Sequence, residues 1–182
     1  MRRFVNPGNT AFEVAVNSQI YVDKTGLLAY TNSVINTKQA LICSSRPRRF
    51  GKSITADMLC AYYSRGCDSD SIFASYEIAK SDSYKKYLNQ YDVIYLDIQW
   101  CMMDAGSAEQ TVSYLNYHVI EELKEIYPQI LLDGIRTAYG AMSCINAQTG
   151  VKFIVIIDEW DVLIRDEAAN EAVLQDYINF LR

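Results

Sequence analysis

The chain has 182 residues, of which 50% are hydrophobic, and its 17 basic and 22 acidic side chains give a formal net charge of −5. This length suits one globular domain spanning residues 1–182, and the acidic balance argues against a surface dedicated to coating nucleic acid. No apolar run approaches the roughly 20 residues of a membrane span, and the N-terminus lacks the apolar core of a signal peptide, so we expect a cytoplasmic protein without a membrane partner.

The hydrophobic pattern predicts helices and strands that alternate along the chain. In chain order we expect a helix over 23–35, a strand over 39–44, a helix from 53 to about 66, a short helix over 81–89, a strand over 93–98, helices over 108–127 and 131–147, a strand over 153–157 and a helix from about 167. This alternation predicts an α/β fold in which helices sandwich a parallel sheet whose strands are joined by right-handed crossovers.

The most informative motif follows the first predicted strand. Residues 46–53 read Arg-Pro-Arg-Arg-Phe-Gly-Lys-Ser, and the order strand, loop, Gly-Lys-Ser, helix is that of a phosphate-binding P-loop. Lys52 would place its charge on the terminal phosphates, and the Ser53 hydroxyl would complete the shell of a Mg²⁺ ion. The general pattern G-x-x-x-x-G-K-[ST] has glycine where this chain has Arg46, so a plain helix start capped by Ser53 stays open as an alternative.

The candidate nucleotide-binding residues form one continuous stretch in which three arginines concentrate positive charge. They are Arg46, Pro47, Arg48, Arg49, Phe50, Gly51, Lys52, Ser53 and Ile54.

A second motif ends the last predicted strand. The apolar run 153–157 predicts a strand buried on both faces, and Asp158 and Glu159 follow at its carboxyl end, where α/β sheets bind ligands. Asp158 would hold Mg²⁺ opposite Ser53, and Glu159 would orient or deprotonate the water that attacks the terminal phosphate. An acidic turn after a strand is the simpler interpretation of this motif alone, but its combination with Gly-Lys-Ser favours a nucleotide site.

Three segments resemble the bacterial AAA-ATPase-like family, in family order and over nearly all of residues 1–182. They are Tyr21-Val22-Asp23-Lys24-Thr25-Gly26-Leu27-Leu28, Ser45-Arg46-Pro47-Arg48-Arg49-Phe50-Gly51-Lys52-Ser53 and Ile157-Asp158-Glu159-Trp160-Asp161.

This resemblance implies a P-loop NTPase-type fold that binds ATP and Mg²⁺, with Arg-Pro-Arg-Arg-Phe-Gly-Lys as the family's own form of the loop. It also implies that Tyr21 to Thr25 contact the adenine and ribose, and that a PD-(D/E)XK nuclease-like domain often follows the ATPase. Trp160 stands where the family usually has tyrosine, which is a conservative aromatic change.

In P-loop ATPases of this class, the strand after the acidic one lies between the two motif strands. The sequence offers three predicted strands and stops within a helical pattern, so we expect a fold that is incomplete at the C-terminus and poorly stable when expressed alone.

Three functions remain open at this point. The first is an ATP-hydrolysing conformational switch in which Lys52 and Glu159 are catalytic, and the second is a nucleotide-binding regulatory module with little turnover. The third is a nucleic-acid processing component in which Arg46, Arg48 and Arg49 contact a phosphate backbone. The acidic net charge and the lack of a D-x(n)-[DE]-x-K pattern after Glu159 argue against the third.

Overall fold

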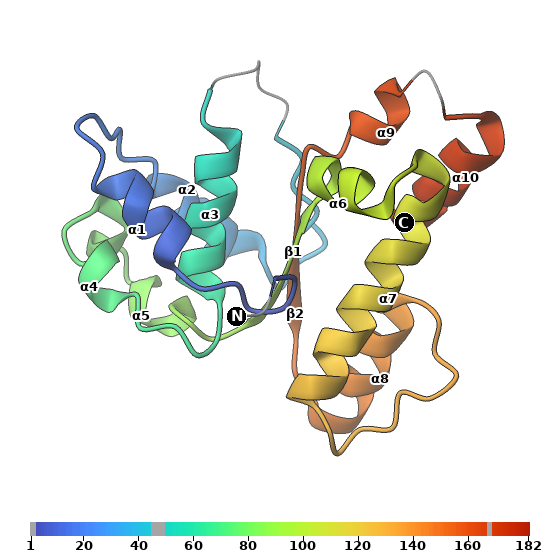
Figure 1. Cartoon of the computed structure of the whole chain (residues 1–182). Coiled ribbons are helices and arrows are strands. Elements are labelled where there is room, and N and C mark those ends of the chain that lie inside the picture. The colour runs from blue at the N-terminus through green and yellow to red at the C-terminus, as the bar shows by residue number, and fades with distance from the viewer. Residues whose placement is uncertain (1–2, 45–49, 167–168) are drawn as a thin grey trace. The chain divides into compact units, whose positions relative to one another are not determined.

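The structure is a computed structural model that describes residues 3–44, 50–166 and 169–182 (Figure 1). The chain divides into two compact units. The first unit comprises Asn6–Val93, and the second comprises Ile94–Arg182 together with the segment that ends at Val5. Within the described ranges, no helix is both long enough and apolar enough to span a membrane.

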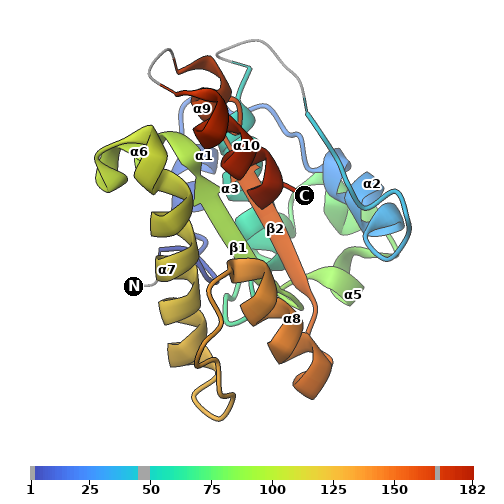
Figure 2. The ribbon, with the colours of Figure 1, turned by 90° about the vertical axis from the view of Figure 1, so that its right-hand side faces the viewer.

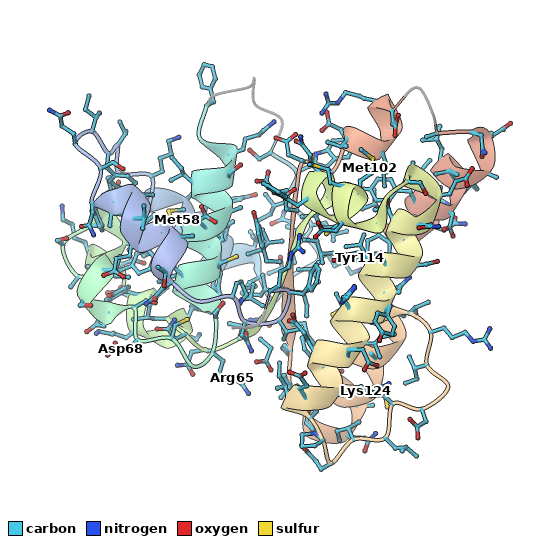
Figure 3. All side chains as sticks on the ribbon, viewed as in Figure 1. Met58, Arg65, Asp68, Met102, Tyr114 and Lys124 are labelled. Atoms are coloured by element: carbon cyan, nitrogen blue, oxygen red, sulfur yellow. The ribbon has the colours of Figure 1, made fainter. Side chains whose placement is uncertain are left out.

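The first unit is helical, and its core forms around the helix that follows the Gly-Lys-Ser motif. Its elements are α1 (Thr10–Val16), α2 (Gly26–Val34), α3 (Lys52–Tyr63), α4 (Asp70–Phe73), the 3-10 helix η1 (Glu77–Lys80) and α5 (Tyr84–Tyr87). Helix α1 packs against α3, and α2 packs against η1 (Figure 1). Met58 of α3 is buried to 1% exposure (Figure 3) and shares the interior with fully buried Phe12, Leu28 and Phe73.

A buried polar network fixes the carboxyl end of α3. The Tyr63 hydroxyl lies 2.5 Å from Thr31 Oγ1 and donates to Asn32 Oδ1 at 2.8 Å, while Asn32 Nδ2 donates to the Tyr62 hydroxyl at 3.0 Å. The Tyr62 hydroxyl in turn donates to the Tyr84 carbonyl at 2.8 Å. Because buried polar groups destabilise a fold unless they are hydrogen-bonded, this network specifies how α2, α3 and α5 pack.

The second unit contains the sheet and the long helices. Its elements are β1 (Asp92–Asp97, whose first two residues belong to the first unit), α6 (Ile98–Ala105), α7 (Ala108–Ile126), α8 (Ala138–Thr149), β2 (Phe153–Asp158), α9 (Val162–Arg165) and α10 (Glu171–Phe180). Strands β1 and β2 are neighbours in a two-stranded parallel sheet. The chain connects them through α6, α7 and α8, as a parallel pair requires, and α7 and α8 lie beside both strands (Figure 2).

Helix α7 shows why this unit has a core. Val112, Leu115, Val119 and Leu123 recur at the three- and four-residue spacing of one helix face, and all four are buried. The opposite face carries charged and polar side chains, including Lys124 (Figure 3), which forms an ion pair with Glu121 at 2.7 Å.

Several predicted elements are confirmed by these bounds. The helices expected over 23–35, 53–66 and 108–127 correspond to α2, α3 and α7, and the strands expected over 93–98 and 153–157 correspond to β1 and β2. The mixed α/β class is therefore confirmed, whereas the P-loop NTPase-type sandwich, incomplete at the C-terminus, stays a prediction.

The strand expected over 39–44 is wrong. This segment has no strand structure, and Leu41 and Ile42 are 95% and 46% exposed. An extended segment becomes a strand only when a neighbouring strand accepts and donates its backbone hydrogen bonds. Within the described part of the chain, no strand pairs with residues 39–44.

Three helix boundaries also differ from the prediction. The helix expected from 131 begins at Ala138, because Gly134 turns the chain at φ +78° and Thr137 accepts a hydrogen bond from Gly140 N as the cap. The helix expected over 81–89 is limited to Tyr84–Tyr87. The last helix begins at Glu171, where Asn170 caps it by accepting from Val173 N.

Candidate functional site

The Gly-Lys-Ser motif forms the amino-terminal turn of α3. Gly51 is the N-cap residue with φ +75° and ψ +34°, a left-handed conformation that strains any residue with a Cβ atom. Lys52 and Ser53 are therefore the first helical residues, and their N–H groups belong to the set that a helix leaves without an intrahelical acceptor. Thr55 N closes the first turn by donating to the Gly51 carbonyl at 3.0 Å.

This arrangement rejects the alternative in which Ser53 caps the helix. Gly51 occupies the cap position, and no side chain among the described residues provides a cap hydrogen bond. Ser53 and Ile54 are exposed, Phe50 is exposed, and Lys52 is half-buried. The N-terminus of a twelve-residue helix thus presents backbone N–H groups, a dipole's positive end and the Lys52 side chain at one place, which is a favourable environment for an anion.

Lys24 also reaches this turn, and the motif analysis of the P-loop missed it. Its Nζ atom donates to the Phe50 carbonyl at 2.8 Å. A Cβ atom added to Gly51 would lie 2.8 Å from the same Nζ. The one sequence signal for Lys24 was its position inside the segment from Tyr21 to Thr25 that resembles the family. The residues of that segment do not by themselves indicate a chemical role.

Four of the predicted nucleotide-binding residues cannot be placed. Arg46, Pro47, Arg48 and Arg49 lie outside the described residues, so their roles stay predictions.

The predicted acidic residues lie at the carboxyl end of β2 in the second unit. Asp158, the last strand residue, is 6% exposed, and its Oδ1 atom accepts a hydrogen bond from Glu159 N at 3.0 Å. Its Oδ2 atom is buried and has no hydrogen-bond partner among the described residues. A buried carboxylate oxygen in this state is costly in free energy, and a bound cation would relieve that cost.

A third carboxylate, Asp97, comes from the carboxyl end of β1. Burial raises the pKa of Asp97, and the charges of Asp158 and Glu159 raise it further, while a hydrogen bond from Trp100 N to Asp97 Oδ1 at 3.0 Å opposes this shift. Asp158 and Glu159 are thus within electrostatic range of Asp97. Since β1 and β2 are parallel neighbours, their carboxyl ends meet at one edge of the sheet.

The described residues contain no group of three or more His, Cys, Asp or Glu side chains arranged to hold a metal by themselves. This does not conflict with the donor chemistry of Asp158, because Mg²⁺ at nucleotide sites takes one or two protein ligands and completes its shell with phosphate oxygens and water. One orphaned buried carboxylate oxygen fits that mode of binding.

The turn after β2 holds Glu159 in a defined place. Glu159 has φ +50°, a left-handed conformation that is uncommon for a residue other than glycine. Its Oε2 atom lies 3.7 Å from Arg165 Nη2, and Arg165 Nε lies 2.9 Å from Asp161 Oδ2. The buried Tyr177 hydroxyl donates to the Trp160 carbonyl at 2.7 Å and anchors the same turn. Sequence reasoning also missed Arg165, whose only signal was its i,i+4 spacing from Asp161.

Each unit thus brings together one set of candidate residues. Lys24, Phe50, Gly51, Lys52 and Ser53 meet at the start of α3 in the first unit. In the second unit, Asp158 and Glu159 lie within electrostatic range of Asp97 at the ends of the two strands, and Glu159 lies beside Arg165.

Comparison with known proteins gives one match. Neither the curated proteins nor the solved structures contain a match to the chain. The sequence model of one family, described as "Predicted AAA-ATPase", matches residues 8–182. Because this match covers nearly the whole chain, the protein belongs to the AAA-ATPase-like family of predicted AAA-ATPases.

Proposed function

We propose that this protein binds MgATP at the start of α3 and hydrolyses it, and that the nucleotide state drives a conformational switch. The observation that carries the proposal is the left-handed Gly51 turn, which opens a twelve-residue helix directly at Lys52 and Ser53. That geometry combines the backbone N–H groups of a helix N-terminus with a cationic side chain, the arrangement that phosphate groups require. Family membership independently supports nucleotide binding.

The catalytic roles follow from the chemistry of each residue. Lys52 would stabilise charge on the transferred phosphoryl group, and Glu159 would orient or deprotonate the attacking water. Ser53 and Asp158 would hold Mg²⁺, which supplies charge neutralisation at the phosphates when bound. The Oδ2 atom of Asp158 supports this assignment, because a buried carboxylate oxygen that has no donor among the described residues is available to a cation.

The remaining predicted residues would complete the phosphate site. The side chains and backbone of residues 46–50 would wrap the phosphates, and Ile54 would add a backbone N–H from the first turn of α3. In the cell we place the protein in the cytoplasm, where a nuclease-like domain in the same polypeptide would be the target of the switch, as the family resemblance implies.

A nucleotide-binding module with little turnover is the second candidate, and one observation favours it. Glu159 lies 3.7 Å from Arg165, which is itself held by Asp161 at 2.9 Å. The Arg165 guanidinium would compete with the attacking water for the Glu159 carboxylate, which would limit turnover. In this alternative, occupancy alone would control the partner domain.

The test measures binding and turnover separately in the wild type, Lys52→Ala and Glu159→Gln. Titration calorimetry with MgATP should give micromolar binding for the wild type and a loss of about 100-fold or more in Lys52→Ala, since this change removes a charged phosphate contact. Lys38→Ala is the matched control, because Lys38 is an exposed lysine of the same unit. Steady phosphate release that Glu159→Gln abolishes would support hydrolysis, whereas binding without release would favour the second candidate. Absence of MgATP binding in the wild type would reject both.

A further inference from the structure

The segment Asp23-Lys24-Thr25 is fixed at both sides of its lysine. Asp23 accepts hydrogen bonds from Thr25 N at 2.8 Å and from Glu77 N at 2.9 Å. Thr25 is fully buried, and its Oγ1 atom accepts from Ile78 N at 3.2 Å. These bonds tie the start of α2 to η1, so Lys24 extends from an anchored backbone.

The ammonium group of Lys24 contacts the turn at Phe50 and Gly51 that opens α3. It bonds the Phe50 carbonyl at 2.8 Å across 26 residues of sequence, and it occupies the space beside Gly51 that a Cβ atom would need. The left-handed φ of +75° favours glycine at position 51, and a Cβ atom there would displace the flexible ammonium group of Lys24.

The position of Lys24 concentrates positive charge at the start of α3. A cation at the N-terminus of a helix faces the positive end of the helix dipole, and Lys52 already contributes a charge at this end of α3. An anion bound at the first turn would interact favourably with both ammonium groups and with the helix dipole.

We propose that Lys24 is a positioning residue of the nucleotide phosphate site. By holding the Phe50 carbonyl, it fixes the Gly51 turn, from which the N–H groups of Lys52 and Ser53 are presented to the phosphates. This inference rests on the proposed MgATP site, and it gives the Asp23-Lys24-Thr25 segment a function that acts through the P-loop backbone.

The experiment compares Lys24→Met, Lys24→Arg and Lys38→Met with the wild type. Dissociation constants are measured for fluorescent ATP and ADP analogues with Mg²⁺, and thermal unfolding of each variant is recorded without nucleotide. Methionine keeps the length of the side chain but removes its donor, whereas arginine keeps a donor and the charge. Lys38 is exposed in the same unit and controls for the loss of one surface charge.

A positioning role predicts a specific pattern. Lys24→Met should weaken ATP and ADP binding alike, by about 10-fold each, because one charged hydrogen bond to the loop is lost. Lys24→Arg should recover most of the affinity, and Lys38→Met should leave it unchanged. The unfolding midpoint of Lys24→Met should fall by only about 2–4 °C, as expected for the loss of one exposed hydrogen bond.

Three results would overturn the inference. Unchanged affinity would show that the loop keeps its shape without Lys24. A loss confined to ATP would show direct contact with the terminal phosphate, and a loss that accompanies a large fall in the unfolding midpoint would show a purely structural role. Failure of the proposed function has a different signature, since the wild type would then bind no nucleotide, or Lys52→Ala would bind as well as the wild type.

Discussion

Replacing Gly51 by alanine perturbs the turn that opens α3, and the structure divides the expected cost into two parts. The first part is conformational, because alanine at φ +75° enters the left-handed region at a cost of about 1–2 kcal/mol. The second part is the contact with Lys24, whose Nζ atom lies 2.8 Å from the new Cβ. Since Lys24 is the flexible end of an exposed side chain, it will move away, and the loss is its hydrogen bond to Phe50, about 1 kcal/mol.

Gly66→Ala provides a matched control for the first part alone. Gly66 lies in the same unit at φ +85°, and a Cβ atom there would meet no atom within 4 Å. We therefore expect Gly66→Ala to lower the free energy of unfolding by about 1–2 kcal/mol and Gly51→Ala to lower it by about 2–3 kcal/mol.

Urea denaturation followed by circular dichroism measures these differences, and a double-mutant cycle isolates the contact. In the background of Lys24→Ala, the extra cost of Gly51→Ala should disappear, leaving a coupling free energy of about 1 kcal/mol. Equal costs for Gly51→Ala and Gly66→Ala, or strict additivity with Lys24→Ala, would refute the assigned contact between Lys24 and the turn.

Three further predictions concern other parts of the chain. Asp158→Asn removes a buried charge whose Oδ2 atom has no partner among the described residues, so the nucleotide-free protein should gain about 1 kcal/mol of stability while Mg²⁺-dependent ATP binding is lost. A lower unfolding midpoint with Mg²⁺ dependence retained would contradict the assignment of Asp158 as a Mg²⁺ ligand. Leu41→Ser should change the free energy of unfolding by less than about 0.5 kcal/mol, because Leu41 is 95% exposed. Leu28→Ala, at a fully buried position, should lower the free energy of unfolding by about 2–5 kcal/mol. A loss above about 2 kcal/mol at Leu41 would mean that its segment is packed as a strand. Burial raises the pKa of Tyr62 to about 12, so the stability that its neutral hydroxyl contributes is present below the unfolded pKa of about 10 and is lost as the pH rises from about 10 to about 12. Absorbance at 295 nm should therefore show the last tyrosines ionising together with the loss of the helical circular dichroism signal. Complete tyrosine ionisation in a protein that is still folded would contradict this.

Elements with strong local signals could be predicted from the sequence. The apolar spacing in α7 and the unbroken apolar run before Asp158 depend on neighbours in the chain, so β2 and α7 were found within one residue of their observed ends. The start of α8 was missed, although Gly134 and Thr137 provide a turn and a cap that could have shown it. Residues 39–44 have the composition of a strand, but pairing is a property of two segments and cannot be read from one.

In the candidate site too, the sequence predicted the local motifs but not the contacts between distant segments. Gly51, Lys52 and Ser53 are adjacent in sequence, so the motif alone predicted that a flexible glycine and a lysine precede a helix starting at residue 53. The structure begins that helix one residue earlier, at Lys52. Asp158 and Glu159 were likewise found from the abrupt end of an apolar run. Only the tertiary structure decided that Lys24 bonds the Phe50 carbonyl, that Asp97 lies within range of the two acids and that Asp158 Oδ2 is buried without a partner. Local motifs depend on the order of residues along the chain, whereas hydrogen bonds between distant segments, burial and the resulting pKa shifts depend on which surfaces pack together.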